Sequence, residues 1–517
     1  MIPAPRLSIP RLLVRLPLAA TKLLLAAAAL VAALATAPPT RAAVEVIVVS
    51  GEPVPGGDAE FLDLLLRQPA INAAGQVVFH AVLDQTEDDL PAEALFVSDG
   101  TTIETVVRSG QPTPAGPISL GGFLEPPVIN DAGQVAFLGS TGFLSYTIQR
   151  WDPGEGLMLI ARTADLAPDG GTFGGFGIPR LDPTGRVVFS AGLQGTPDDS
   201  EEGVFVGDGD TLTTIARHKD PAPRGPGSFE LFAFPVIGST GKVVVAVTLG
   251  AAGDGILYSE ADGSPPSFVV RSGDGVPAGT GSFLGGVANS EYAIDDQDRV
   301  WFDALVSSPG GSVRGIYVWD EGVLTELARE GGALPLDGGP SPVDQLALLN
   351  VSDQGRIVLL ADDALYAIED GTARLVAADG DPAPGGGSIS LRDGDGGWGS
   401  VEINDAGQVA FEAFAGDGRA LFVHDPEQGL FEIARHGDAF LGGTIGWLFL
   451  PGAGVMGRRA LNDAGQVVFT FELDDGRNGV ARWTIPAPEP AAAAPVALAA
   501  LAALAARRTR AVRRVRS

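Results

Sequence analysis

The chain has 517 residues, and its 71 glycines and 39 prolines make up about a fifth of it, against about 12% in average proteins. Because 45% of the residues are hydrophobic and 19% are charged, a disordered polymer is excluded. The absence of cysteine excludes disulfide scaffolds, zinc-thiolate sites, iron–sulfur ligation and thiol catalysis. The net charge of −30 argues against a nucleic-acid partner, since phosphate binding needs clustered cationic side chains.

Residues 1–42 are typical of a secretory signal peptide. Basic residues lead into an apolar core over 23–37, and small residues around Thr40 and Ala42 provide a cleavage site. The alternative is an uncleaved membrane anchor. The apolar core is shorter than the ~20 residues that a spanning helix needs, which favours cleavage and export.

Between residues 43 and 486 one motif returns eight times, at spacings of 52 to 58 residues, from INAAGQVVF (71–79) to LNDAGQVVF (461–469). An aliphatic residue ends one strand, a polar turn reverses the chain, and an apolar run with a buried Phe begins the next strand. The turn begins with Asn or Asp, which can accept a backbone N–H, and Gly then adopts the left-handed conformation. The clearest turn pairs are Asn72 and Gly75, Asn130 and Gly133, Asn404 and Gly407, and Asn462 and Gly465.

The fifth copy carries Asp298 in place of the turn glycine. We expect the turn to survive there, because Asp tolerates the left-handed region better than most residues.

A second pattern follows each motif. The stretch 94–116, ALFVSDGTTIETVVRSGQPTPAG, predicts a strand, an Asp-Gly turn, another strand and a Pro/Gly-rich arm loop, and later copies repeat it. Each unit thus holds about four short strands and shows no helical periodicity. Four strands in about 56 residues predict a propeller blade.

The two ends of the repeat array complement each other. Residues 44–57 match an arm without a preceding turn motif, and the last motif is followed by a strand at 479–486 without an arm. We therefore predict an all-β, closed β-propeller of eight four-stranded blades over residues 43–486, with one blade shared between the N- and C-terminal ends. Such sharing removes free sheet edges.

These residues resemble the NxxGxxAF tandem-repeat family of secreted bacterial proteins across essentially the whole core. The resemblance implies no assigned chemistry.

Residues 487–517 form a second signal in three parts. Pro488-Glu489-Pro490 comes first, an apolar run follows over 491–506, and six arginines end the chain. This order resembles the PEP-CTERM sorting signal of Gram-negative bacteria. The resemblance implies an exosortase-type sorting enzyme as partner and delivery to the cell surface or extracellular matrix. The alternative is a plain tail anchor, because sixteen apolar residues can just cross a bilayer.

Acidic residues gather in the loops after the Phe-bearing strands. The densest group is Asp198, Asp199, Glu201 and Glu202. Such carboxylates could hold Ca²⁺, the one cofactor that the sequence suggests, although no loop has EF-hand spacing. The alternative is a solvated acidic rim.

Arginine ends the arm strand in six of the eight copies, and Asp follows three positions later in four of them. This spacing favours a structural ion pair, while an arginine ring that grips an anionic glycan is the sharper alternative. The binding candidates of this kind are Arg108, Arg217, Arg271 and Arg435.

An unusual insertion at 393–399 adds three further binding candidates, Asp393, Asp395 and Trp398. An exposed Trp could form a platform for a sugar ring.

No catalytic residue is predicted. The four histidines form no ligand pair, and the chain has neither a Gly-x-Ser-x-Gly elbow nor a Walker-type phosphate loop. The leading interpretation is a non-enzymatic binding or matrix component at the cell surface, with a polysaccharide or surface protein as ligand and membrane contact only through the C-terminal segment. The alternatives are a carbohydrate-active propeller enzyme that uses acidic loop residues, and a purely structural surface layer.

Overall fold

The computed structural model describes residues 44–488 except 88–89, 119–124, 278–280, 286–290, 335, 337–340, 370, 393–398, 417 and 453–458. The predicted leader, the tail from residue 489, and the candidates Asp393, Asp395 and Trp398 therefore lie outside the described residues. Across this part of the chain no helix is long and apolar enough to cross a membrane.

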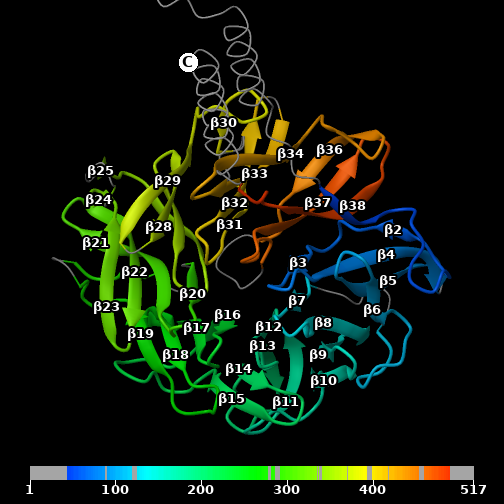
Figure 1. Cartoon of the computed structure of the whole chain (residues 1–517). Helices are drawn as coiled ribbons and strands as arrows, with labels where there is room; N and C mark the ends of the chain where they lie inside the picture. The colour runs from blue at the N-terminus through cyan, green and yellow to red at the C-terminus, as the bar shows by residue number, and fades with distance from the viewer. Residues whose placement is uncertain are drawn as a thin grey trace, which may run out of the picture. The chain divides into compact units, whose positions relative to one another are not determined.

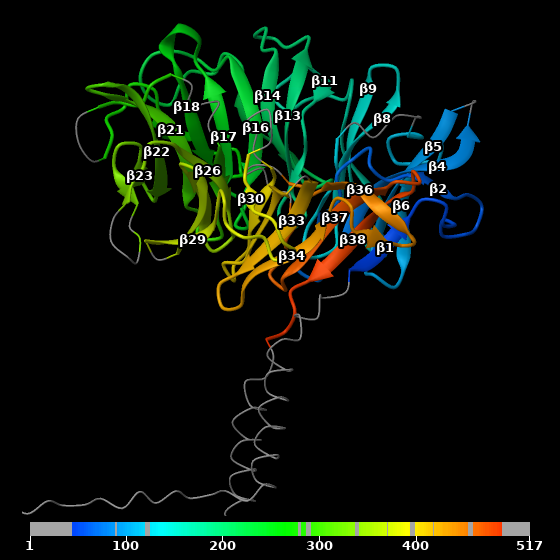
Figure 2. The same cartoon turned by 90° about the horizontal axis from the view of Figure 1, so that it is seen from above.

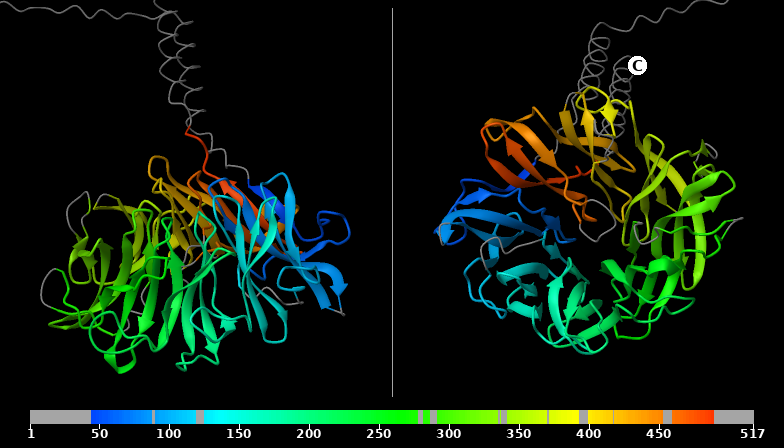
Figure 3. Two further views of the ribbon diagram at one scale, coloured as in Figure 1. Left: turned by 90° about the horizontal axis from the view of Figure 1, so that it is seen from below. Right: turned by 180° about the vertical axis from the view of Figure 1, so that it is seen from behind.

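The described strands form eight antiparallel blades around a central axis, which confirms the predicted propeller (Figure 1). In each blade the chain runs from the centre of the ring outward, so the first strand lies innermost. Figure 3 shows the same ring from below and from behind.

The first four blades follow one another along the chain. Blade 1 contains β2 (Phe61–Asp63), β3 (Ala70–Ile71), β4 (Val77–Glu87), β5 (Leu90–Ser98) and β6 (Ile103–Arg108). Blade 2 contains β7 (Val128–Ile129), β8 (Val135–Gly142), β9 (Ser145–Asp152) and β10 (Gly156–Arg162). Blade 3 contains β11 (Thr172–Phe176), β12 (Arg180–Leu181), β13 (Val187–Gln194), β14 (Glu202–Gly207) and β15 (Leu212–Arg217). Blade 4 contains β16 (Leu231–Ile237), β17 (Val243–Thr248), the 3-10 turn η1 (Gly250–Ala252), β18 (Asp254–Ser259) and β19 (Ser267–Arg271).

The other four blades complete the ring. Blade 5 contains β20 (Tyr292–Ile294), β21 (Val300–Ser308), β22 (Gly311–Asp320) and β23 (Val323–Arg329), and the small pair β24 (Ala333–Leu334) and β25 (Ser341–Pro342) follows it. Blade 6 contains β26 (Leu346–Val351), β27 (Ile357–Ala361), β28 (Ala364–Glu369) and β29 (Thr372–Ala378). Blade 7 contains β30 (Ile389–Ser390), β31 (Val401–Ile403), β32 (Val409–Ala415), β33 (Gly418–Asp425) and β34 (Gly429–Arg435). Blade 8 contains β35 (Ala439–Phe440), β36 (Gly443–Phe449), β37 (Gln466–Leu473), β38 (Asn478–Thr484) and β1 (Glu45–Val49).

Blade 8 closes the ring by combining both ends of the chain, as predicted. β1 pairs antiparallel with β38, with Glu45 opposite Arg482 (Figure 2). Arg482 donates two hydrogen bonds to the Glu45 carboxylate, at 3.0 and 2.7 Å, and another to the carbonyl of Gly75 in blade 1. One buried guanidinium thus joins the first strand, the last strand and the first blade.

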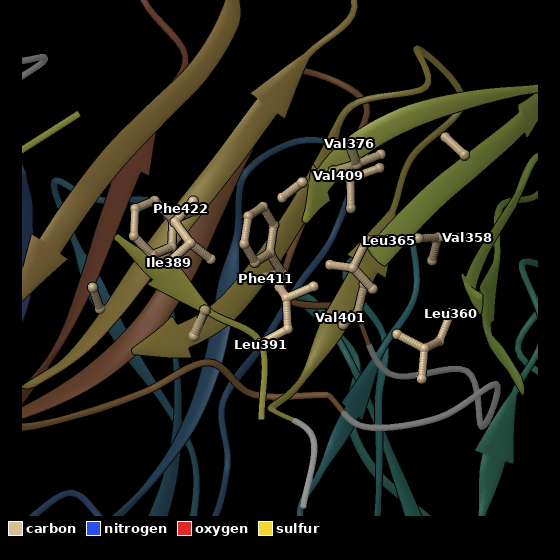
Figure 4. Close-up of a cluster of buried hydrophobic side chains, with 14 of the residues drawn as sticks. Val358, Leu360, Leu365, Val376, Ile389, Leu391, Val401, Val409, Phe411 and Phe422 are labelled. Carbon is tan, nitrogen blue, oxygen red and sulfur yellow. The ribbon is translucent and has the colours of Figure 1, made fainter. Parts of the chain in front are cut away.

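The hydrophobic core is divided into layers between neighbouring blades. One layer joins blades 6 and 7, where Val358 and Leu365 meet Ile389 and Phe411 (Figure 4). Other clusters likewise combine residues of two adjacent blades. Because each blade buries apolar side chains on both faces, its strands are nearly continuous in hydrophobic residues, as the motif predicts.

Candidate functional site

The eight turn motifs meet at one end of the ring, where each joins the innermost strand of its blade to the second strand. All eight residues at the fourth turn position have φ between +62° and +95°, and Asp298 has the lowest value. In the Asn copies the side-chain oxygen accepts the backbone N–H four residues later, as between Asn72 and Gln76 at 2.8 Å. This bond fixes the turn locally.

The same asparagines connect neighbouring blades. Asn72 donates through Nδ2 to the carbonyl of Asn130, at 3.0 Å, and Asn130 donates to the carbonyl of Asp182, at 2.9 Å. Asn404 donates to the carbonyl of Asn462, at 2.8 Å, and Asn462 donates across the closure to the carbonyl of Asn72, at 2.9 Å. These four asparagines form a continuous arc from blade 7 through the closure to blade 3.

Where the turn begins with Asp, the residue four positions later is Arg. Asp182 accepts a hydrogen bond from Arg186 Nε, and Asp295 accepts one from Arg299 Nε, both at 2.7 Å. Arg299 also donates to the carbonyl of Gln354 in the next blade, at 3.0 Å. A carboxylate cannot donate, so at the Asp295 turn Arg299 supplies the contact between blades that the Asn amide supplies in the Asn copies.

A cavity of about 220 Å³ lies at this end of the ring, lined by the inner strands and turns of all eight blades. Its walls carry several charged side chains. Asp353, Asp405 and Asp463 each offer one carboxylate oxygen, and these oxygens lie within 4.8 Å of one another.

The pKa of Asp353, one of these three acids, is shifted. Burial raises its pKa to about 6, and the neighbouring carboxylates of Asp296 and Asp405 add to the rise. The ion pair with Arg459 opposes it. Burial would lower the pKa of Arg459, but the surrounding carboxylates outweigh that effect and the pKa is raised.

Glu402 is a fourth acid on the cavity wall. It extends from β31 and is 3% exposed. Burial raises its pKa well above the ordinary value, against the opposing influence of Arg459 and of a hydrogen bond with Asn350. Its Oε1 has no hydrogen-bond partner within the described residues.

The four candidate arginines all donate hydrogen bonds to other groups of the protein. Arg108 donates to both carboxylate oxygens of Asp58, at 3.0 Å each. Arg217 is 4% exposed and donates to the carbonyl of Gly170, while Arg271 is 5% exposed and donates to the carbonyl of Arg224. Arg435 donates to the carbonyl of Gly386, at 3.0 Å, and to Glu432.

Each of these guanidinium groups thus forms a hydrogen bond with the arm loop of the preceding blade, 47 to 50 residues earlier in the chain. The Asp three positions later has another role. Asp220 and Asp438 accept the backbone N–H of Arg217 and Arg435, at 2.9 and 3.0 Å. Within the described residues, Arg162 is the arm arginine that forms a direct ion pair with the Asp three positions later, Asp165.

The acidic loop after β13 is organised by its own contacts. Both carboxylate oxygens of Asp198 accept hydrogen bonds from Ser200, and these bonds lower the pKa of Asp198. The carbonyl of Asp199 accepts a hydrogen bond from Lys219 Nζ, at 2.9 Å. Glu201 donates its backbone N–H to His218 Nδ1 at 3.1 Å.

Glu202 differs from its neighbours in this loop because it is partly buried. Burial raises its pKa, and its carboxylate accepts the backbone N–H of Phe232, at 3.4 Å. The four acids of this loop do not form a cluster like that of Asp353, Asp405 and Asp463 within the described residues.

Sequence reasoning missed two features. The first is the trio of carboxylates, although Asp recurs at the second turn position in five of the eight motifs. The second is an aromatic pair on β36. The Trp447 and Phe449 rings are nearly parallel, at 3°, with centroids 5.5 Å apart, and Trp447 is 39% exposed.

Comparisons with known proteins give a family and several similar solved structures. Similar solved structures include the β-propeller domain of the trilobed protease from Pyrococcus furiosus, at 12% identity and a TM-score of 0.41, covering 71% of this chain and 99% of that chain. TolB from Acinetobacter baumannii matches at 12% identity and a TM-score of 0.29, covering 69% and 80%. An uncharacterized protein from Listeria monocytogenes EGD-e matches at 10% identity and a TM-score of 0.35, covering 76% and 100%.

No protein of the curated set matches the sequence. A family of unknown function (DUF7453) matches residues 32–149, 147–358 and 341–494. Since these matches span most of the sequence, the chain belongs to this family of unknown function.

Proposed function

We propose that the protein is a non-enzymatic binding component of the cell surface or extracellular matrix, and that its ligand is a polysaccharide. The predicted leader and the PEP-CTERM-like tail support export and sorting to the surface. The observation that carries the choice of ligand is the stacked pair of Trp447 and Phe449 on β36.

The aromatic pair has the properties of a sugar-binding surface. Stacking on Phe449 holds the Trp447 indole in one orientation, so little conformational entropy is lost when a ligand binds. The indole keeps 39% of its surface exposed, and an aromatic ring offers an apolar face to the C–H groups of a sugar together with a polar N–H at its edge.

Polar side chains accompany the rings. Trp447 lies opposite Glu472 and Phe449 lies opposite Thr470 in the pairing of β36 with β37. Directly opposed residues share one face of the sheet, so the Glu472 carboxylate lies beside the indole, where it can accept hydrogen bonds from sugar hydroxyls.

The proposed surface is separate from the turn motifs. Glu472 lies six residues along β37 from Gln466, which follows the turn, and six residues of strand span about 20 Å. Binding at the aromatic pair can therefore be tested without disturbing the acidic end of the ring.

Retention of the full chain on immobilised polysaccharides of differing charge and linkage tests this function. We expect at least one polysaccharide to retain the protein, and Trp447→Ala to weaken binding about tenfold, the effect of losing ~1.4 kcal/mol of stacking and burial. Phe143→Ala is the matched control, since Phe143 is 94% exposed on the turn between β8 and β9 of blade 2.

Three outcomes would overturn the proposal. Retention of the protein by none of the polysaccharides would favour a surface-protein ligand or a structural layer. Equal binding by wild type and Trp447→Ala would exclude the aromatic pair as the site. Release of shortened sugar chains would show that the protein is a carbohydrate-active enzyme.

A further inference from the structure

The turn between β8 and β9 departs from the pattern of the repeat. In every blade a turn joins the second strand to the third, at the end of the ring opposite the turn motifs, and in five of the eight blades this turn contains Asp or Glu. Blade 2 has Phe143 and Leu144 instead. Phe143 is 94% exposed and Leu144 is 62% exposed, so two neighbouring apolar side chains extend from the surface of this blade.

Leu144 also has an unfavourable backbone conformation. Its φ is +55°, in the left-handed region that Gly, Asn and Asp adopt far more easily than Leu does. In the corresponding turns of blades 3 to 8, every described residue with positive φ is Gly or Asp, as at Asp199, Asp362 and Gly476. Because most of the Leu144 side chain is exposed, packing within the protein does not offset this strain. A contact outside the chain would explain why Leu is present here.

Hydrogen bonds at the base of the turn hold the two side chains in place. Ser140 Oγ donates to the carbonyl of Gly142, at 2.9 Å, and the hydroxyls of Thr141 and Ser145 lie 2.9 Å apart. A turn that is already ordered loses little conformational entropy when its side chains bind.

The hairpin that carries the turn is uncharged. Residues 132–149 include no Asp, Glu, Lys or Arg, in a chain whose net charge is −30. At the same end of blade 2, Arg162 and Asp165 neutralise each other in an ion pair. The apolar side chains can therefore enter an apolar medium without removing an unpaired charge from water.

A third exposed apolar side chain lies at this end of blade 2. Thr163 donates its backbone N–H to the carbonyl of Tyr146, at 2.9 Å, which places the start of the arm loop beside the hairpin. Leu166 follows three residues later and is 81% exposed.

The size of this surface favours a lipid bilayer over a protein partner. An aromatic side chain buries ~150–250 Å² and a leucine less, so Phe143 and the two leucines offer roughly 400–500 Å², whereas a standard protein interface buries ~800 Å² on each partner. A bilayer accepts single apolar side chains and requires no complementary shape. Hydroxyl groups at the base of the turn suit the level of the lipid headgroups.

We propose that Phe143, Leu144 and Leu166 insert into a zwitterionic lipid bilayer, so that blade 2 contacts the membrane surface. A chain with this acidic balance is repelled by anionic lipids, which makes an uncharged bilayer surface the appropriate partner. The contact is independent of the proposed polysaccharide site, since Trp447 belongs to blade 8.

A fluorophore beside the turn tests the proposal. The chain has no cysteine, so Ser145→Cys provides one labelling site, and an environment-sensitive label there reports lipid contact whether or not the C-terminal segment also binds the vesicles. We expect the emission of the labelled full chain to rise when phosphatidylcholine vesicles are added. Fluorescence lifetimes give the ratio of lipid-contacting to solvent-exposed label, and Phe143→Ser should lower this ratio about tenfold.

The matched control is Gly310→Cys. Gly310 lies in the corresponding turn of blade 5, which contains neither a charged nor a large apolar residue, and a Cβ atom there would meet no atom within 4 Å. We expect a label at this position to show no response to the vesicles.

Leu144→Gly separates lipid contact from a role in the fold. Gly adopts positive φ freely, so this variant should unfold at the same urea concentration as wild type or a higher one, while insertion of the label at position 145 weakens several-fold. A variant that loses both stability and insertion would contradict the strain argument.

Three results would overturn the proposal. The first is an emission at position 145 that does not respond to vesicles, and the second is an equal response at positions 145 and 310. The third is a rise in emission with protein concentration when vesicles are absent, which would show that a second copy of the chain covers these side chains.

Discussion

Replacing one asparagine tests how the ring is held closed. Asn462 donates to the carbonyl of Asn72, at 2.9 Å, and to Gln466 Oε1, at 2.8 Å, and it accepts the Gln466 N–H at 2.9 Å. Asn130 makes the matching set, donating to the carbonyl of Asp182 at 2.9 Å. Asn462 bridges the two ends of the chain, whereas Asn130 bridges two consecutive blades.

The expected loss follows from the hydrogen bonds. Each contributes about 1 kcal/mol net, so Asn462→Ala and Asn130→Ala should each lower the free energy of unfolding by about 3 kcal/mol. That is a large part of the ~5–15 kcal/mol that holds a typical domain folded. At the closure only the bond to Asn72 joins blade 8 to blade 1, so its loss, about 1 kcal/mol, makes separation of these blades about fivefold more frequent.

Hydrogen exchange measured by mass spectrometry distinguishes the two variants. We expect amide exchange in β1 and β38 to accelerate about fivefold in Asn462→Ala and to remain unchanged in Asn130→Ala, while urea unfolding shows similar losses for both. Equal protection of β1 in the two variants would refute the idea that this asparagine contributes specifically to closure.

Two further substitutions probe other buried groups. The Tyr292 hydroxyl lies 2.6 Å from the carbonyls of both Ala233 and Phe234, and Phe234 has φ +42°. Tyr292→Phe should therefore lower the free energy of unfolding, measured in urea, by about 1–3 kcal/mol. A change below about 0.5 kcal/mol would contradict this role. Burial, together with the nearby Arg374 guanidinium, lowers the pKa of His424 to about 4. Between about pH 4 and 6.5 the unfolded chain therefore binds more protons at this residue than the folded chain does. The contribution of His424 to stability is lost as the pH falls through that window. Subtracting the pH profile of His424→Gln from that of wild type should isolate this slope, and identical profiles would show that His424 does not contribute.

Much of the fold could be predicted because its determinants are local. The turn motif marks the boundary between the first two strands of every blade, and its period sets the blade length. The segment 44–57 is an arm without a preceding turn motif, and the last turn motif has no arm after it. Closure of the ring could therefore be predicted, because these two incomplete units together make one blade.

The candidate site was harder to predict because it depends on how blades pack. Asp353, Asp405 and Asp463 are separated by more than fifty residues at each step and become neighbours through the curvature of the ring. The arm arginines showed a regular spacing to a following Asp, but Arg217 and Arg271 turn back to a loop of the preceding blade. That contact follows from the angle between blades, which the spacing of residues does not encode.

The shared blade also affects how the protein is made. Glu45 and Arg482 are paired across 437 residues, so β1 is among the first described segments to be synthesised and among the last to find its partner. At about 5–20 residues per second, a ribosome needs roughly 20–90 s to deliver β38. During that time blade 1 lacks one neighbour and β1 is an unpaired strand, and the nascent chain must be kept from associating with other copies.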